Sequence, residues 1–463
     1  MLSGSSAEAL LRIIFTAVLA RLLSPGDFGL LASAMVVISF ADLFSQFGFG
    51  PAIVQREKLS DRMLATSLTV SVALGFVFMA LFWVINPFIS TFFRMPDLTQ
   101  ILNVLIILFP LRSATQISYA LLQRNLDFKR LAGLDVLSYT IGYGLIGIGL
   151  ALSGHGVWSL VYGVIAQAAI YCALVWSKSI KYLSFGFNYS DAKTLAFYGL
   201  NFTSARFFNF IALKGDYFII GKYLGDAQLG FYSRAYGLMN APNSIVGKVL
   251  NNVLFASFSK VQSDKSRLDK GIQIGMKGLF MFILPVSIWC FFLAEELVLA
   301  LLGNQWKNVV IPFQVLTLGM VFRLGYKIGG SYLRGTGYVV QNSLVQILYA
   351  LLVIFGVSLT VYLGGSLVQI AWSIDLALFI TFLYTMFYVV GYSGYTWRKM
   401  LAQLRTPIIY SLLLSLVLYA FSIATQNWLI LFRLGVSSIF LILACVIPLN
   451  KDSVIRSLIL KSP

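Results

Sequence analysis

The side chains of this chain that could do chemistry are basic residues inside long apolar segments. Arg12, Arg112, Arg206 and Arg323 each fall near the middle of such a segment. A lipid-facing charge at the centre of a bilayer costs roughly 2.5–3.5 kcal/mol. These guanidinium groups must therefore pair with acids or face a watery cavity. The other basic residues in apolar segments are Lys214, Arg234, Lys248, Lys277, Lys327 and Arg433.

Acidic residues in the same segments are too few to neutralise all of these cations. They are Glu8, Asp42, Asp135, Asp216, Asp375, Glu295 and Glu296. The excess of buried positive charge predicts an anionic ligand. The forked donors of guanidinium match the oxygens of a diphosphate better than a point charge does. The predicted substrate-binding residues are Arg12, Arg112, Arg206, Lys214, Arg323 and Lys327.

Two helical segments carry the most specific of these patterns. Arg323, Lys327 and Arg334 are spaced so that they share one helix face, and we expect them to form a cationic wall turned toward the interior. In the segment 196–221, Arg206 and Asp216 share one side of the helix. That second pattern fits either a ligand site or an internal Arg–Asp network that holds a bent helix.

The acids could have a role of their own. Asp42 and Asp216 are candidates for coupling to a proton or a sodium ion. The alternative is that both carboxylates only neutralise nearby arginines.

The composition shows what surrounds these charges. Hydrophobic residues make up 59% of the 463 residues, charged residues make up 11%, and the mean hydropathy is +0.85. Soluble domains carry about 25% charged residues, so the solvent of this chain must be largely lipid. A net charge of +17 would suggest nucleic acid in a soluble protein. Here the charges lie mainly in short gaps between apolar runs, as loop anchors of membrane helices do, and no nucleic-acid partner is expected.

Segments of the length that crosses a bilayer, about 20 apolar residues, predict an all-α integral membrane protein of about fourteen helices. Lys and Arg cluster in the loops of one side, which places both termini in the cytoplasm. The loops are too short to hold a catalytic domain. The basic residues of the opposite side are Arg94, Lys222 and Lys307, with Arg21 at a boundary. The predicted spans are 3–23, 29–50, 63–87, 100–122, 132–153, 157–177, 196–221, 230–257, 272–301, 310–334, 341–363, 366–392, 405–424 and 428–449.

The chain also repeats itself. Residues 21–31 (RLLSPGDFGLL) align without gaps on 222–232 (KYLGDAQLGFY), and residues 118–124 match 329–335 more loosely. Two six-helix halves that enter from the same side are therefore expected, related by an axis along the membrane normal. The predicted parts are an N-terminal lobe 1–178, a cytoplasmic linker 179–195, a C-terminal lobe 196–393, and two further helices with a cytoplasmic tail at 394–463.

The sequence shows no catalytic apparatus. Cys172, Cys290 and Cys445 lie in apolar runs without pairing or metal-ligand spacing, and His155 lies in a predicted outer loop. There is no Gly-Lys-Ser/Thr phosphate loop, no pair of carboxylates and no Ser–His–Asp set. We expect a protein that is not an enzyme, with no catalytic residue, no metal and no cofactor.

Six segments, in this order, carry a family resemblance. They are LARLLSPGDFGLL (19–31), FGFGPAIVQR (47–56), SYALLQRNLDFKR (118–130), IIGKYLGDAQLGFYSRAYGL (219–238), NSIVGKVLNNVLFASFSKVQSD (243–264) and GSYLRGTGY (330–338). Together they resemble the Wzx-type polysaccharide flippases of the multidrug/oligosaccharidyl-lipid/polysaccharide exporter superfamily. The resemblance covers nearly the whole chain, although no segment specifies a sugar.

The resemblance implies a V-shaped pair of six-helix lobes around a central cationic cavity, with two extra C-terminal helices. The cavity opens alternately to the cytoplasm and the periplasm. The implied substrate is an undecaprenyl-diphosphate-linked oligosaccharide repeat unit for O-antigen, capsule or exopolysaccharide, flipped outward across the bacterial cytoplasmic (inner) membrane. Family members are similar in keeping basic residues on helix seven, matched here by Arg206 and Lys214. Candidate partners besides the lipid bilayer are a proton or sodium ion, the polysaccharide polymerase and other assembly proteins.

Two other functions stay open at this point. One is a multidrug antiporter of the same superfamily, although cationic drugs require an acidic cavity and this chain predicts a basic one. The other is a membrane-embedded polysaccharide polymerase or glycosyltransferase. That enzyme would need a sizeable catalytic loop or an acidic motif for metal and nucleotide binding.

Overall fold

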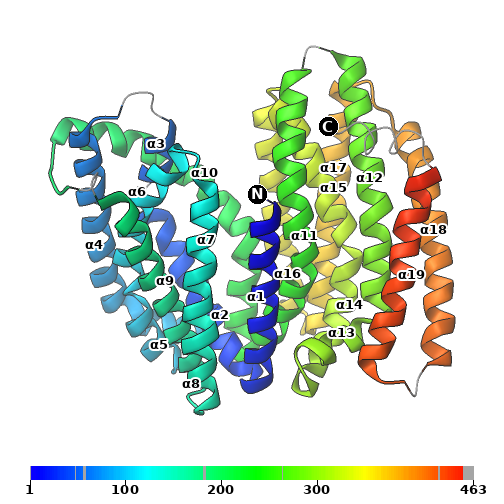
Figure 1. Ribbon diagram of the computed structural model, residues 1–463, viewed down its shortest axis with the longest axis horizontal. Helices are drawn as coiled ribbons and strands as arrows, with labels where there is room; N and C mark the ends of the chain where they lie inside the picture. The colour runs from blue at the N-terminus through cyan, green and yellow to red at the C-terminus, as the bar shows by residue number, and fades with distance from the viewer. Residues whose placement is uncertain are drawn as a thin grey trace. The chain divides into compact units, whose positions relative to one another are not determined.

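The computed structural model describes residues 2–46, 48–55, 59–180, 184–262, 264–425 and 428–451. These ranges hold helices and no strand (Figure 1). Side chains are described for the same residues except 2–9, 55, 195–206, 208, 243–253, 256 and 446–451. The prediction of an all-α protein is confirmed for this part of the chain.

The helices divide between two compact units, an N-terminal unit (Met1–Ser233) and a C-terminal unit (Arg234–Pro463). The N-terminal unit contains α1 (Leu2–Leu22), α2 (Pro25–Ser45), α3 (Phe49–Gln55), α4 (Asp61–Phe93), α5 (Leu98–Leu105), α6 (Leu108–Arg124), α7 (Phe128–Tyr139), the π-helix η1 (Thr140–Gly147), α8 (Ile148–Leu152), α9 (Val157–Ser179) and α10 (Tyr189–Leu224). The boundary falls inside α11 (Asp226–Lys260). The C-terminal unit continues with α12 (Lys265–Phe292), α13 (Ala294–Leu301), the 3₁₀-helix η3 (Asn304–Val309), α14 (Val310–Leu318), α15 (Met320–Gly335), α16 (Val339–Tyr362), α17 (Leu367–Tyr392), α18 (Trp397–Ala424) and α19 (Ile430–Lys451).

Many of these helices are membrane spans by length and composition. Within the described residues, nine helices are long and apolar enough to cross a bilayer. The number is ten if Asn304–Leu318 and Met320–Gly335, bent by 41° at their junction, form one broken span. The multi-pass membrane character is thus confirmed, whereas the count of fourteen stays a prediction.

Several helix boundaries differ from the predicted ranges for local reasons. Helix α2 begins at Pro25 rather than near 29, because Ser24 and Asp27 form a capping box and Pro25 occupies the first turn. It ends before Gly48, whose φ of 66° interrupts the predicted span 29–50.

The predicted span 310–334 is also broken, because α14 and α15 meet at Gly319. A Cβ atom at Gly319 would lie 2.1 Å from an Asp375 carboxylate oxygen, so the junction has room only for glycine.

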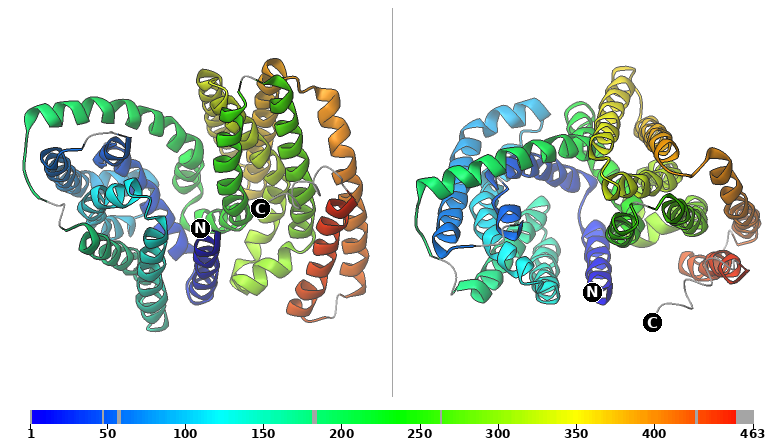
Figure 2. Two further views of the ribbon diagram at one scale, coloured as in Figure 1. Left: turned by 45° about the horizontal axis from the view of Figure 1, so that its top comes forward. Right: turned by 90° about the horizontal axis from the view of Figure 1, so that it is seen from above.

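Close helix packing forms the core of the N-terminal unit. Helix α4 lies against α6 where Gly75 meets Pro110, and a Cβ at Gly75 would come within 2.8 Å of the Pro110 Cα. Phe82 and Phe109 continue this contact with ring centroids 5.2 Å apart. Figure 2 shows α10 passing across one end of this unit. Small residues let helix backbones approach in lipid, and the surrounding aromatic rings fill the core.

The two repeated segments found in the sequence contact each other reciprocally. A Cβ at Gly29 would lie 1.7 Å from the Asp226 carbonyl oxygen, and a Cβ at Gly230 would lie 1.9 Å from the Pro25 carbonyl oxygen. In the sequence alignment Gly29 corresponds to Gly230, and Pro25 to Asp226. The first turns of α2 and α11 therefore pack through equivalent glycines, as two copies related by a local two-fold axis would.

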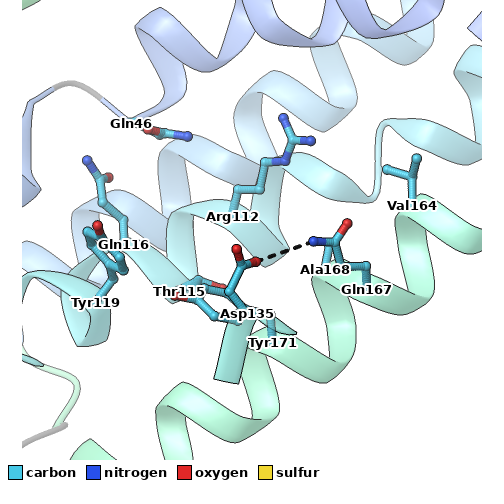
Figure 3. Close-up of a pocket in the computed structure, with 10 residues that line it drawn as sticks. All are labelled: Gln46, Arg112, Thr115, Gln116, Tyr119, Asp135, Val164, Gln167, Ala168 and Tyr171. Carbon is cyan, nitrogen blue, oxygen red and sulfur yellow. Dashed lines mark hydrogen bonds between the residues drawn. The ribbon is translucent and has the colours of Figure 1, made fainter. Parts of the chain in front are cut away.

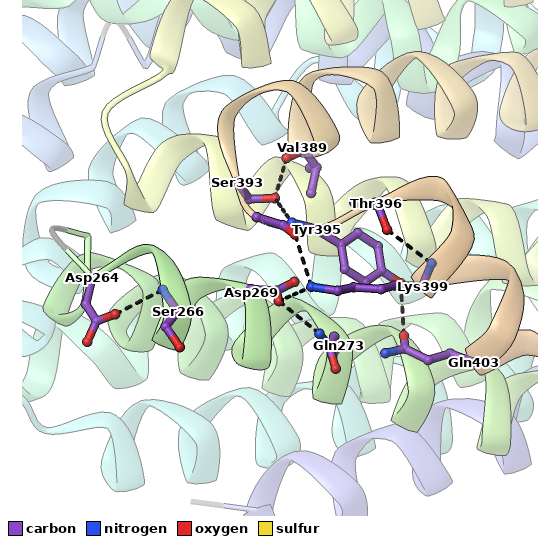
Figure 4. Close-up of polar contacts among 11 residues, drawn as sticks. Asp264, Ser266, Asp269, Gln273, Val389, Ser393, Tyr395, Thr396, Lys399 and Gln403 are labelled. Atoms are coloured by element: carbon purple, nitrogen blue, oxygen red, sulfur yellow. Dashed lines mark hydrogen bonds and ion pairs between the residues drawn. The ribbon is translucent and has the colours of Figure 1, made fainter.

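In the C-terminal unit, polar contacts tie α12 to the connection between α17 and α18 (Figure 4). The Lys399 ammonium donates to Asp269 Oδ2 at 2.5 Å and to the Gly394 carbonyl at 3.1 Å. Burial raises the pKa of the Tyr395 hydroxyl, which stays protonated and donates to Gln403 Oε1 at 2.9 Å. These contacts anchor the start of α18 to the rest of the unit.

The reciprocal contact gives a stability prediction. Gly29→Ala and Gly230→Ala each place a methyl group on a backbone oxygen, so the helices must separate, at a cost of about 1–3 kcal/mol or more. We expect a clear fall in the melting temperature of the detergent-solubilised protein, followed by size-exclusion chromatography after heating. Gly237→Ala is the matched control on α11, because a Cβ there meets nothing within 4 Å. Equal stability of all three variants would contradict the packing.

Candidate functional site

A polar cavity of about 300 Å³ lies inside the N-terminal unit (Figure 3). Its walls come from the end of α2, from α6 and α7, and from α9. Eight of the ten residues that line it carry groups that can hydrogen-bond: Gln46, Arg112, Thr115, Gln116, Tyr119, Asp135, Gln167 and Tyr171. A water-accessible cavity among membrane helices is the setting in which intramembrane polar residues are expected to be functional.

Arg112 is the basic residue in the wall of this cavity. One of its guanidinium nitrogens donates to the Asp42 carboxylate, which is buried on α2. The Arg112 side chain keeps 28% of its surface exposed, and it makes no other hydrogen bond with the described residues. Asp42 therefore holds Arg112 in place while further donors of the fork stay available to a ligand.

Arg12 pairs with Asp135, which lines the cavity. Its guanidinium donates to Asp135 Oδ2 at 3.3 Å and lies 4.6 Å from the centroid of the Tyr139 ring. The other oxygen of Asp135 accepts a weak hydrogen bond from the Gln167 amide at 3.5 Å, which Figure 3 marks. Of the predicted residues, Arg112 therefore lines the cavity, whereas Arg12 and Asp42 each form an ion pair with a lining residue.

The charges around this cavity balance formally. Arg12 faces Asp135 and Arg112 faces Asp42, so two of the predicted midplane cations have acidic partners. What remains is a lining of amide, hydroxyl and phenol groups that can donate and accept hydrogen bonds. Such groups can pair with the hydroxyl groups of a ligand, which also both donate and accept hydrogen bonds.

The predicted cluster on α10 is partly described. The buried Asp216 carboxylate accepts hydrogen bonds from the Tyr232 hydroxyl and, at 2.9 Å, from the Tyr217 backbone N–H. The Lys214 ammonium lies 4.2 Å from the centroid of the Tyr217 ring. The side chain of Arg206 lies outside the described residues. Asp216 is thus held by tyrosine, and the predicted pairing of Arg206 with Asp216 stays a prediction.

The predicted stripe on α15 lies in the C-terminal unit. Arg323 is 3% exposed, donates to the Tyr236 hydroxyl on α11 and lies with its guanidinium carbon 4.7 Å from that ring centroid. Among the described residues, Nε and Nη1 of Arg323 have no hydrogen-bond partner. Lys327 follows one turn later and is partly buried, while Arg334 donates to the Ser331 hydroxyl at 3.4 Å.

Arg323 also has a buried acid in its unit that it does not contact. Asp375 on α17 is 6% exposed, and within the described part of the chain its carboxylate has no side-chain hydrogen-bond partner and no basic nitrogen within 4.0 Å. Unsatisfied charged groups in a buried environment are costly. This unit therefore holds a cation with spare donors, whereas the cations of the N-terminal cavity have acidic partners.

Two partnerships escaped sequence reasoning. Arg433 on α19 forms an ion pair of 2.7 Å with Glu296 on α13, and both side chains are largely buried, although Arg433 could have reached the membrane surface from its position near a helix end. Tyr236 holds Arg323 although it carries no charge. Counting charges in the sequence gives only the totals of acidic and basic residues, not which of them pair. It also gives no indication that a tyrosine hydroxyl is the partner of an arginine.

Comparison with known proteins identifies the chain. The model of the polysaccharide biosynthesis protein family matches residues 18–311. The chain belongs to this family. Its relatives include the succinoglycan biosynthesis transport protein ExoT of Rhizobium meliloti (strain 1021), which is 25% identical over 71% of this chain and 66% of the relative. The lipopolysaccharide biosynthesis protein WzxC of Escherichia coli (strain K12) is 24% identical over 69% of this chain and 65% of the relative. The resemblance to polysaccharide flippases is thereby confirmed.

The fold of this family member is shared with solved transporters. The lipid II flippase MurJ in an inward closed conformation gives a TM-score of 0.77 at 14% identity, covering 97% of this chain and 98% of MurJ. A multidrug resistance MATE family transporter of the MOP superfamily gives 0.65 at 15% identity, covering 83% and 95%. The polysaccharide biosynthesis protein therefore has the fold common to MurJ and MATE transporters.

The Arg112–Asp42 pair gives a prediction that separates a structural role from a binding role. Arg112→Ala leaves the Asp42 carboxylate buried without its cation, and we expect a loss of about 2 kcal/mol in stability, less than for a fully buried pair because Arg112 is partly exposed. Adding Asp42→Asn should recover most of that stability in a thermal-shift measurement. A double variant as unstable as Arg112→Ala would show that the pair is not what holds the two helices.

Proposed function

We propose that this protein flips undecaprenyl-diphosphate-linked oligosaccharide repeat units from the cytoplasmic to the outer leaflet of the bacterial inner membrane. The units would serve O-antigen, capsule or exopolysaccharide synthesis. The observation that carries the proposal is the sugar-compatible cavity with Arg112 in its wall, inside a multi-pass membrane protein of the polysaccharide biosynthesis family.

Two groups of residues fit the two chemical parts of this cargo. Amides and hydroxyls such as Gln46, Gln116 and Gln167 fit the hydroxyl groups of sugars, which both donate and accept hydrogen bonds. Arg323 and Lys327 fit the diphosphate, because Arg323 has spare donors and Lys327 adds a second positive charge one turn away. In this proposal Arg12, Lys214 and Arg206 support the same recognition.

A multidrug antiporter shares the fold, so the choice rests on the residues. The MATE transporter and MurJ resemble this chain at 15% and 14% identity, which supports the architecture alone. Cationic drugs require uncompensated acids, whereas Asp135 in the N-terminal cavity and Asp42 next to its Arg112 are both paired with arginines. Asp42 and Asp216 stay our candidates for coupling to a proton or sodium ion. If vesicles without ion gradients or a membrane potential transport the cargo at an undiminished rate, these two residues are not coupling sites.

Substitution of Arg323 tests the proposed diphosphate site. A hydrogen bond to an ionised partner contributes roughly 1.5–3 kcal/mol, so Arg323→Ala should weaken cargo engagement by about ten- to a hundredfold. Arg323→Lys keeps the charge without the fork and should be intermediate. The measurement is polymer at the cell surface, normalised to the amount of folded protein in the membrane. Full surface polymer with Arg323→Ala at normal or low expression would refute the role.

The proposed orientation, with both termini in the cytoplasm, rests on the distribution of Lys and Arg among the loops. Reporter fusions after residues 60, 127, 187 and 265 should all show cytoplasmic activity. A periplasmic signal at any one of these positions would overturn the orientation.

A further inference from the structure

A second hollow in the N-terminal unit differs in kind from the polar cavity. It is an apolar groove of about 350 Å³ between α2, α4 and α10. All of its lining residues are apolar, and most are phenylalanines: Phe40, Phe82, Phe88, Phe92, Phe93 and Phe218. Phe88 and Phe92 are 74% and 45% exposed, so the groove opens at the surface of this unit. Its size and apolar walls suit the hydrocarbon part of a ligand.

Two cations lie where α4 and α10 end beside this groove. The Lys222 ammonium is 4.0 Å from the centroid of the Phe92 ring, and Phe92 lines the groove. Arg94 caps α4 directly after Phe93, in a left-handed conformation with φ of 57°, and its side chain is exposed. Gly221, next to Lys222, packs against Phe93, since a Cβ there would lie 3.0 Å from the ring. The two basic residues therefore flank the same end of the groove.

The positive charge at this end has no ion-pair partner among the described residues. Asp97 and Asp226 stand at the starts of the next helices, α5 and α11, but neither carboxylate comes within 4.0 Å of Lys222 or Arg94. An apolar groove with two cations at one end complements an amphiphile that has a long hydrocarbon chain and a multiply charged anionic head. A zwitterionic phospholipid offers no excess charge, and a phosphatidylglycerol offers one negative charge for two cations.

We propose that the groove holds the isoprenoid chain of a polyprenyl diphosphate lipid and that Lys222 and Arg94 bind its phosphates. The assignment rests on the proposed function, because it supplies a second contact for the same cargo. In the proposed orientation α4 runs outward from its start at Asp61, which puts Arg94 and Lys222 at the outer leaflet. The groove then binds the hydrocarbon chain of the cargo while the charged head leaves the protein.

Photolabelling tests the groove directly. The probe is geranylgeranyl diphosphate with a diazirine at the end of its chain, added to the full-length protein in phosphatidylethanolamine nanodiscs. We expect cross-links within residues 82–93. The Arg94→Glu/Lys222→Glu variant should reduce labelling about tenfold, as expected for losing hydrogen bonds to an ionised partner. Lys307→Glu, which changes another exposed basic residue predicted on the outer side, should leave it unchanged.

Three results would overturn the proposal. Equal labelling by geranylgeraniol with the same diazirine would show that the charged head is irrelevant. Competition by phosphatidylglycerol as strong as by unlabelled polyprenyl diphosphate would show an ordinary lipid groove. Labelling unaffected by the charge reversals would show that Arg94 and Lys222 do not contribute to binding in the groove. If the double variant does not elute as a monodisperse peak, the milder Lys222→Gln variant takes its place in the test. Its labelling should fall by less than the roughly tenfold expected for the double variant.

A transport assay keeps this proposal distinct from the proposed function. If the unaltered protein moves lipid-linked cargo in vesicles but is not labelled within residues 82–93, the groove proposal falls and the function stands. If the groove is labelled as expected but no lipid-linked cargo moves, the flippase function falls while binding of polyprenyl diphosphate stands.

Discussion

A charged group inside the membrane-spanning part is costly unless it finds a partner within the protein, because hydrocarbon offers none. Arg112 meets Asp42, Arg12 meets Asp135, and Arg433 meets Glu296. Each pair joins two different helices. Replacing one partner of a pair would leave the charge of the other without its counter-ion. The pairs link α2 to α6, α1 to α7 and α13 to α19, in addition to the apolar packing between these helices.

The same constraint sets Arg323 apart from the paired arginines. Arg323 is buried as deeply as a structural charge, yet its partner is a phenol, and two of its nitrogens stay unsatisfied among the described residues. A group held in that way is positioned but not neutralised. Pre-positioned donors with remaining capacity bind an incoming anion without first breaking a salt bridge.

The helical architecture was predictable, because a bilayer imposes one length and one polarity on every span. The breaks at Gly48 and Gly319 were not, since each depends on a left-handed turn or on a side chain from a distant helix. Among the site residues, Arg12, Arg112 and Asp42 could be named from charge alone. Their partners could not be foreseen, because the sequence does not show that Arg112 meets Asp42 or that Asp135 lies between Arg12 and the Gln167 amide. The phenylalanine groove was equally invisible, since phenylalanine is common throughout apolar spans.

The reciprocal packing of Gly29 on Asp226 and of Gly230 on Pro25 has a historical consequence. Equivalent residues that touch one another in exchange form an isologous contact, the kind that identical subunits make across a two-fold axis. A half-length ancestor carrying one such segment could have formed this contact with a second copy of itself. Fusion of two genes would then have preserved an existing dimer interface and freed each copy to diverge, as the different residues at 25 and 226 have done while the glycines stayed alike.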